Sequence, residues 1–308
     1  MSIYQERSRN RLSIGQSGNT LTMLIAVILM VFVVLAFIKL IYYFTYSESG
    51  LALYNQQVLS WLVLPAHVPT LLTRPWTLIT HFFVHDGVWH IIGNMLWLWV
   101  FGSIFQDLSG NSKIVPVFVY GALTGAVMYL LAFNLIPAFK DRTVLASALG
   151  ASAGVMAVAI ATTTLAPNFR IFPMLNGGIP LWVITMIFVI IDLATIPYNN
   201  AGGHIAHLAG AGFGFLFIVM LRRGSDWSTG MNNFFDWVNN LFNPDKPKKA
   251  KVIKSQLFYK ADKPPYRKTS GVTQQRIDEI LDKINQKGYE TLTQEEKDIL
   301  KRASKEDL

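Results

Sequence analysis

Four polar side chains of this chain could together carry out acyl transfer. Ser152 supplies a hydroxyl that could act as a nucleophile, and His207 supplies an imidazole that could take its proton. His90 and Asn94 lie four residues apart, on one face of a helix, and both could donate hydrogen bonds to a developing oxyanion. These residue types therefore indicate a nucleophile, a general base and an oxyanion hole.

Long apolar segments must position these residues. Of the 308 residues, 52% are hydrophobic and only 15% are charged, which is typical of a membrane protein. Each apolar segment is close to the ~20 residues that a helix needs to cross the hydrocarbon core. We therefore predict an all-α membrane protein built as a bundle of six transmembrane helices. The expected spans are 22–44, 88–106, 114–136, 145–165, 179–197 and 204–221.

The topology places the four polar residues at one depth. Helices that cross a bilayer alternately make the second, fourth and sixth spans enter from the same face, and the polar residues lie in the opening stretch of these three. A rise of about 1.5 Å per residue puts them roughly 5 to 12 Å below that surface. Because unpaired polar groups are costly at this depth, their coincidence favours a functional site.

Small residues surround the serine and the histidine, at Gly150, Gly154, Ala206, Gly210 and Gly214. Such residues let helix backbones approach closely within a membrane. Gly210 and Gly214 lie three and seven residues after His207, so they flank its face of the sixth span. We therefore expect the fourth and sixth spans to pack together and to bring His207 to Ser152.

Each residue also has a purely structural interpretation. A transmembrane serine often bonds back to its own helix, and His207 could be an interhelical histidine. His204, one turn earlier, is a rival base with a poorer glycine context. His90 and Asn94 could simply pack two helices together.

Charge distribution predicts the orientation. The net charge is +8, and basic residues before the first span and after the sixth place both termini in the cytoplasm under the positive-inside rule, although Lys140 and Arg142 would then lie outside. Basic residues concentrate after Arg222, where anionic lipid would attract them, and they form no recognisable nucleic-acid-binding module. No cysteine is present, so disulfides and thiolate metal sites are excluded, and we expect no metal or cofactor.

The rest of the chain divides around the membrane domain. Residues 1–21 form an N-terminal cytoplasmic segment, and 22–221 form the six-span domain with an interfacial outer loop at 46–87. An amphipathic helix and a basic linker follow over 222–272. Residues 273–308 have the pattern of a cytoplasmic helical hairpin, with Thr293 and Glu296 as a capping box. The hairpin is either a solvated tail or a docking element for a cytoplasmic protein.

Three separated motifs resemble the signatures of rhomboid intramembrane serine proteases. They are His90-Ile-Ile-Gly-Asn94, Gly150-Ala-Ser152 and Ala206-His207-Leu-Ala-Gly210. Their order and their span placement match the family, and His81 and His85 extend the resemblance to its second-span pattern. The resemblance covers residues from about 50 to 221.

The resemblance implies a Ser/His dyad that cuts transmembrane segments of other proteins, in an inner bacterial membrane with the site opening outward. Ser152 would be the nucleophile and His207 the general base. The side chains of His90 and Asn94 and the backbone amide of Ser152 would form the oxyanion hole. Gly150 matches the position of a backbone contact to the substrate.

The chain departs from the family pattern at several positions. Ala153 replaces the glycine that commonly follows the serine, and Met156 replaces a tyrosine that often stacks on the histidine. An arginine in the outer loop is also typical of the family, and the motifs do not place its equivalent in this sequence. Asp192 is an intramembrane acid on the fifth span. Because family members of this type are dyads, we expect Asp192 to act in gating or packing rather than to contact His207.

Two rival functions remain at this point. The first is a rhomboid-like pseudoprotease that binds transmembrane helices without cutting them, although the presence of Ser152 and His207 argues against it. The second is a multispan haem-binding or transport protein, since histidines on facing helices can ligate haem iron. The second leaves the serine and the asparagine unexplained.

Overall fold

A computed structural model describes residues 19–174, 177–241 and 274–306 of the chain. The expected N-terminal cytoplasmic segment and the basic linker lie almost wholly outside the described residues. The chain forms two compact units, Met1–Pro244 and Asp245–Leu308. The first contains the apolar helices, and it is described first.

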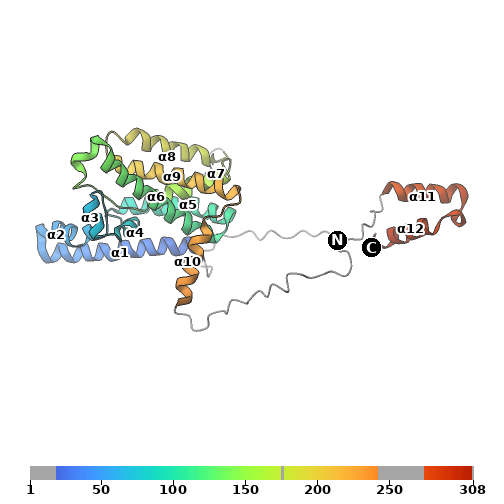
Figure 1. Cartoon of the computed structure of the whole chain (residues 1–308), viewed down its shortest axis with the longest axis horizontal. Helices are drawn as coiled ribbons and strands as arrows, with labels where there is room; N and C mark the ends of the chain where they lie inside the picture. The colour runs from blue at the N-terminus through green and yellow to red at the C-terminus, as the bar shows by residue number, and fades with distance from the viewer. Residues whose placement is uncertain (1–18, 175–176, 242–273, 307–308) are drawn as a thin grey trace. The chain divides into compact units, whose positions relative to one another are not determined.

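Among the described residues, six apolar helices make up most of the larger unit (Figure 1). They are α1 (Thr20–Tyr46), α5 (Val88–Ser109), α6 (Ile114–Leu135), α7 (Ser152–Leu165), α8 (Leu181–Thr195) and α9 (Ala201–Arg222). Within the described residues, four helical stretches are long and apolar enough to cross a membrane: Thr20–Trp61, Val88–Ser109, Asn111–Leu135 and Ala201–Arg222. The protein is therefore a helical integral membrane protein, and α7 and α8 are shorter apolar helices.

The expected fourth helix, 145–165, was wrong at its start, because α7 begins only at Ser152. The preceding residues are extended, and strand β2 (Ser147–Ala148) pairs antiparallel with β1 (Leu64–Pro65). Gly150 has a φ of +112°, which no helix accepts, and its N–H donates to the carbonyl of His81 at 2.9 Å. The serine therefore lies in the first turn of α7 rather than inside a longer helix.

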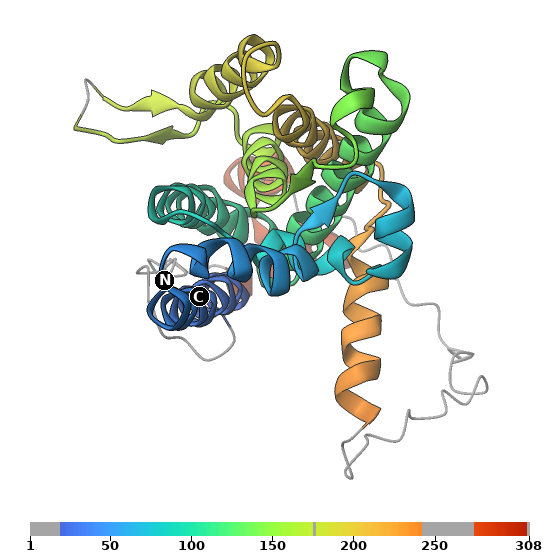
Figure 2. The same ribbon diagram turned by 90° about the vertical axis from the view of Figure 1, so that its left-hand side faces the viewer.

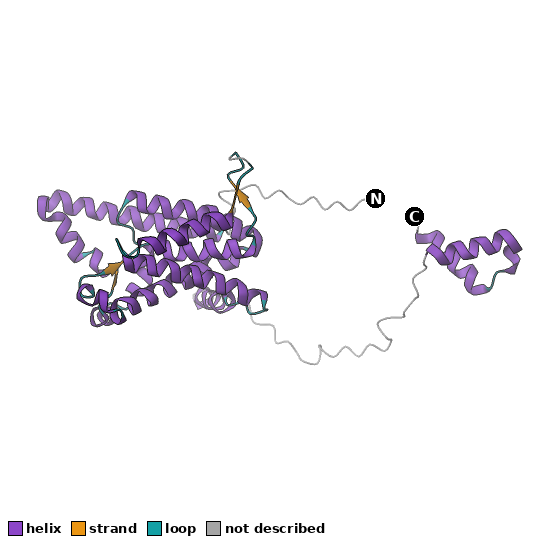
Figure 3. Cartoon of the chain, turned by 90° about the horizontal axis from the view of Figure 1, so that it is seen from above, coloured by secondary structure: helices purple, strands orange, loops and turns teal. Residues whose placement is uncertain are grey.

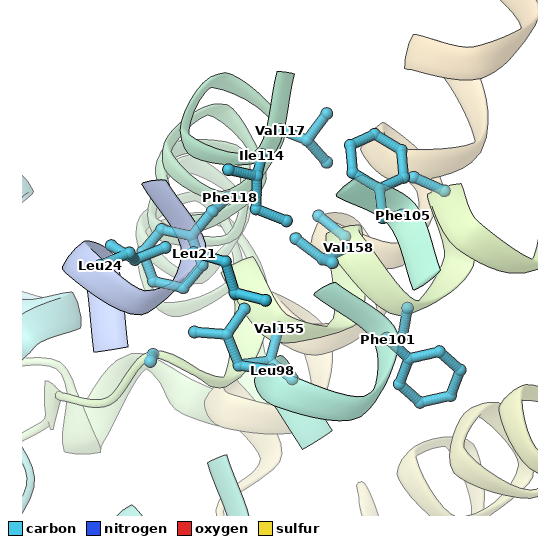
Figure 4. Close-up of a cluster of buried hydrophobic side chains, with 14 of the residues drawn as sticks. Leu21, Leu24, Leu98, Phe101, Phe105, Ile114, Val117, Phe118, Val155 and Val158 are labelled. Carbon is cyan, nitrogen blue, oxygen red and sulfur yellow. The ribbon is translucent and has the colours of Figure 1, made fainter. Parts of the chain in front are cut away.

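Helix α7 lies at the centre of the unit, in contact with α5, α6 and α9 (Figure 2). Most of its side chains are small and buried, which allows three neighbours to surround it. Figure 4 shows large apolar side chains from α1, α5 and α6 packed around Val155 and Val158 of α7. This packing holds the first turn of α7 in a fixed place.

The segment between α1 and α5 contains short helices rather than a further span. They are α2 (Gly50–Gln57), α3 (Val68–Thr73) and α4 (Thr77–Thr80), with 3-10 turns at Ser47–Ser49, Leu59–Trp61 and His81–Phe83. A second pair of strands, β3 (Arg170–Ile171) and β4 (Ile179–Pro180), connects α7 to α8 (Figure 3). In the segment between α1 and α5, Pro65 lies in β1, Pro69 in the first turn of α3 and Pro75 between α3 and α4.

An amphipathic helix, α10 (Ser228–Leu241), follows α9 and exposes Phe234, Phe235 and Trp237. In the second unit, α11 (Gln274–Lys287) and α12 (Gln294–Glu306) pack against each other, and Ile280 of α11 and Leu292 of the connecting turn are buried. The capping box is present, since the N–H of Thr293 donates to Glu296 Oε2 at 2.8 Å.

Candidate active site

Ser152 and His207 come together where α7 meets α9. Oγ of Ser152 lies 2.6 Å from Nε2 of His207, although 55 residues separate them in the sequence. The distance is that of a short hydrogen bond. The structure therefore brings the candidate nucleophile and the candidate base into the contact that proton transfer requires.

Two glycines of α9 make this approach geometrically feasible. A β-carbon at Gly210 would overlap the carbonyl oxygen of Ala153, and one at Gly214 would overlap that of Ala157. Both contacts are with the backbone of α7, so α9 rests directly on the first two turns of α7. Because Gly210 follows His207 by one turn, the same contact sets the distance between His207 and Ser152.

Gly154 is a helix-packing position, as expected, and the helix that packs on it is α6. A β-carbon at Gly154 would lie 2.7 Å from Cδ2 of Phe118, which belongs to α6. Each residue of a helix turns about 100°, so residue 154 lies on a different face of α7 from residue 153, whose carbonyl meets Gly210. Gly154 thus admits the third long helix to the centre of the bundle.

His90 lies over the backbone of Gly150. A β-carbon at Gly150 would come within 2.8 Å of Cε1 and 2.9 Å of Nε2 of the His90 ring. The positive φ of Gly150 turns the chain beneath this ring just before Ser152. The side chain of His90 therefore faces the same small space as the serine hydroxyl.

Asn94 is buried one turn below His90 and lines a cavity together with Ser152 and His207. Its Nδ2 donates to the backbone carbonyl of His90 at 2.9 Å, within its own helix. The second amide hydrogen is chemically available to a group in the cavity. The placement fits an oxyanion donor as well as the packing role that the sequence left open.

His81 and His85 support the turn that carries the serine. Nδ1 of His81 donates to the carbonyl of Thr77 at 2.8 Å, and Nε2 of His85 accepts from the N–H of Ala151 at 3.3 Å. Burial penalises the charged imidazolium and lowers the pKa of both rings from 6.5 to about 4. Both rings are therefore neutral at physiological pH and act as structural supports.

The expectation that Asp192 would not contact His207 was wrong. Oδ1 of Asp192 lies 2.9 Å from Nδ1 of His207 and 2.7 Å from Nδ1 of His204. The two histidines are one turn apart on α9 and face the last turn of α8, so one buried carboxylate reaches both. Oxygen and nitrogen donors of these three residues lie within 4.8 Å of one another, so they could also ligate a divalent metal ion.

Two cavities meet at the serine. One, of about 200 Å³, lies beneath β1 and β2 and is lined by His81, Tyr129 and Asn200 as well as by His90, Ser152 and His207. The other, of about 320 Å³, lies between α5 and α8 and is lined by Asn94, Met156 and Asp192 together with the same three residues. The serine hydroxyl is thus accessible from two sides.

Sequence reasoning missed two residues, one beside the site and one in the outer loop. The hydroxyl of Tyr129 is buried beside the first cavity and has no hydrogen-bond partner among the described residues. Arg74 lies in the outer loop, where its guanidinium is 4.1 Å from the ring centre of Trp61 and donates to the carbonyl of Ser60 at 2.8 Å. The neighbouring tryptophans, Trp61 and Trp76, were a sequence signal for Arg74, because guanidinium groups stack on such rings.

Comparison with known proteins identifies the larger unit. Residues 72–224 match the model of the rhomboid domain, and residues 266–306 match a family of unknown function, DUF6576. The chain is 27% identical over 157 residues to RHOMBOID-like protein 12, mitochondrial, of Arabidopsis thaliana, a match that covers 48% of this chain and 47% of that protein.

Bacterial relatives match over a shorter stretch. Rhomboid protease GlpG of Salmonella newport (strain SL254) and of Salmonella heidelberg (strain SL476) are each 35% identical over 69 residues, which is 22% of this chain and 25% of theirs. The chain therefore spans less than half the length of these relatives. The rhomboid domain match covers all three motifs of the candidate site. The chain belongs to the rhomboid family.

Proposed function

We propose that this protein is an intramembrane serine endopeptidase that cleaves transmembrane segments of other membrane proteins. The observation that carries the proposal is the 2.6 Å contact between Oγ of Ser152 and Nε2 of His207. A hydroxyl and an imidazole in this contact form the nucleophile and base of a serine hydrolase. Family membership supports the same chemistry.

The reaction proceeds through an acyl-enzyme. Oγ of Ser152 attacks the carbonyl carbon of the substrate peptide while its proton passes to Nε2 of His207. The developing oxyanion accepts hydrogen bonds from the backbone N–H of Ser152, from Asn94 and from His90. His207 then protonates the leaving amine, and water that enters through the cavity beneath β1 and β2 hydrolyses the ester.

The apolar helices and the basic residues at both ends of the chain support a membrane arrangement. We propose that α7 and α8 cross the bilayer with the four longer stretches, which gives six spans, and that both termini lie in the cytoplasm of a bacterial inner membrane. Ser152 then lies toward the outer face, where water can reach it. Because a helical substrate hides its carbonyls in its own hydrogen bonds, we expect targets with glycine or proline near the cut.

Cleavage in reconstituted vesicles tests the proposal. The wild-type chain should cleave members of a panel of single-span proteins and react at Ser152 with a fluorophosphonate probe. The Ser152→Ala and His207→Ala variants should lose cleavage, and only the serine variant removes the atom that the probe labels. If Ser152→Ala cleaves as fast as the wild type, the proposal is wrong. If the wild-type chain binds these helices but neither cleaves them nor reacts with the probe, the protein is a pseudoprotease.

A further inference from the structure

Asp192 continues the hydrogen-bonded chain that begins at Ser152. The serine hydroxyl contacts one nitrogen of His207, and the carboxylate of Asp192 contacts the other nitrogen at 2.9 Å. Asp192 is only 6% exposed, so its carboxylate is held among protein groups rather than solvated. Serine, histidine and aspartate therefore lie in series, on three different helices.

The carboxylate determines which nitrogen of His207 carries the proton. An ionised carboxylate can only accept hydrogen bonds, so Nδ1 of His207 must donate to Asp192. In the neutral ring this leaves Nε2 without a proton and with its lone pair toward Oγ of Ser152. This is the tautomer that a general base needs, and the opposite tautomer would be unable to take the serine proton.

The negative charge also offsets the charge that forms during the reaction. When the Oγ–H bond of Ser152 breaks, the proton moves to Nε2 and His207 becomes an imidazolium. Asp192 keeps its own charge throughout and lies next to this cation in a setting where solvent screening is weak. Its role is thus to hold and stabilise His207 and not to receive the proton.

His204 anchors the same carboxylate from the other side. Its Nδ1 lies 2.7 Å from Oδ1 of Asp192 and 3.3 Å from Oγ1 of Thr195. Two donors on one carboxylate oxygen fix the direction in which Asp192 faces α9. His204 does not take the role of the base, because His207 is the histidine whose Nε2 lies 2.6 Å from Oγ of Ser152.

The side chain at 156 lies beside this support. The family pattern that the sequence resembles often has a tyrosine there, whereas Met156 offers no aromatic ring. Met156 and Asp192 line the same cavity between α5 and α8, beside His207. The carboxylate thus supplies an orienting contact where the aromatic one is missing.

We propose that Asp192 is a positioning residue that extends the Ser152–His207 pair to a hydrogen-bonded chain of three residues, and this inference rests on the proposed protease function. Asp192 would then act on the proton transfer through His207. A residue that merely gates substrate entry or packs α8 against α9 would have a different experimental signature, because gating alters access and packing depends on shape.

The substitution Asp192→Asn separates these roles, because it keeps the shape of the side chain and removes its charge. We expect the rate of fluorophosphonate labelling at Ser152, and kcat for a transmembrane substrate, to fall roughly 100-fold or more while KM changes less than about threefold. Asp226→Asn is the matched control. Asp226 bonds Ser228 and pairs with Lys113, away from the site, and this variant should label at the wild-type rate.

Other outcomes would overturn the inference. Labelling of Asp192→Asn within threefold of the wild-type rate would leave Asp192 with a packing role, and a change in KM alone would leave it with a gating role. If the wild-type chain does not react with the fluorophosphonate, or if Ser152→Ala cleaves the substrate, the proposed function itself is wrong. The two failures are therefore distinguishable.

A second measurement reads the tautomer of His207 in the wild-type protein, and variants serve only to assign its signals. In wild-type protein with ¹⁵N-labelled histidine, the six imidazoles can be assigned by single substitutions, with His207→Gln removing the signal of interest. We expect neutral His207 to carry its proton on Nδ1. A proton on Nε2 would overturn the inference, because the ring would then donate to Ser152.

Discussion

The backbone of Gly150 lies directly beneath the imidazole of His90, so that a β-carbon on residue 150 would come within 2.8 Å of the ring. The substitution Gly150→Ala must therefore displace His90 or the turn before Ser152. The φ of +112° adds strain of about 1 to 3 kcal/mol for a residue with a side chain. We expect this variant to lose cleavage and to melt at a lower temperature. If Gly150→Ala cleaved at the wild-type rate, the position of the His90 ring would not matter for activity.

The contact of Gly210 with Ala153 predicts a second effect. In Gly210→Ala the new methyl group would overlap the backbone of α7, push α9 away and lengthen the distance between Ser152 and His207. We expect at least a roughly 100-fold loss of kcat, the scale typical of a lost catalytic contact, and a lower melting temperature.

Gly212 provides the matched control for this substitution. It lies on the same helix, and a β-carbon there would meet no atom within 4 Å. Gly212→Ala should keep its activity and should be no less stable, since alanine favours helix more than glycine does. Equal activity in the two variants would show that the spacing of α7 and α9 does not control the site.

The two buried histidines, His81 and His85, predict how stability depends on pH. Both have pKa values lowered to about 4 in the folded protein, against 6.5 for an ordinary histidine. The unfolded chain therefore binds more protons between these values, and the free energy of unfolding falls as the pH drops from 6.5 toward 4. The dependence should flatten near pH 4, where the folded rings are protonated too.

Thermal unfolding in detergent between pH 7 and pH 4 measures this effect. We expect His85→Gln to weaken the dependence, because the amide oxygen of glutamine can still accept from Ala151 but does not titrate. A variant with the full wild-type slope would contradict the assignment to His85.

Arg74 predicts a contribution to stability from the outer loop. Its guanidinium covers the ring of Trp61, and it donates to the carbonyl of Ser60. Arg74→Ala loses both contacts and should lower the free energy of unfolding by about 1 to 3 kcal/mol. Arg74→Lys keeps the positive charge but loses the planar guanidinium group. Its free energy of unfolding should therefore lie between those of the wild type and Arg74→Ala. Unchanged melting of Arg74→Ala in a thermal shift assay would contradict this role.

The sequence by itself determined the features that depend on local chemistry. Long apolar segments predict membrane helices because lipid cannot satisfy an open backbone, and the small residues at 210 and 214 predict a close approach. The residue types at 90, 94, 152 and 207 predict an acyl-transfer site, since few other combinations bring a nucleophile, a base and amide donors to one depth. Thr293 and Glu296 predict a helix start because a capping box needs only neighbouring residues.

Only the tertiary structure decided which side chains meet. The start of α7 at Ser152 depends on the pairing of residues 147–148 with residues 64–65, which no local pattern reveals. The position of Gly154 against Phe118 and that of Asp192 against His207 depend on how the helices are rotated about their axes. An apolar membrane helix has little amphipathic asymmetry to define that rotation, so packing between distant segments sets it.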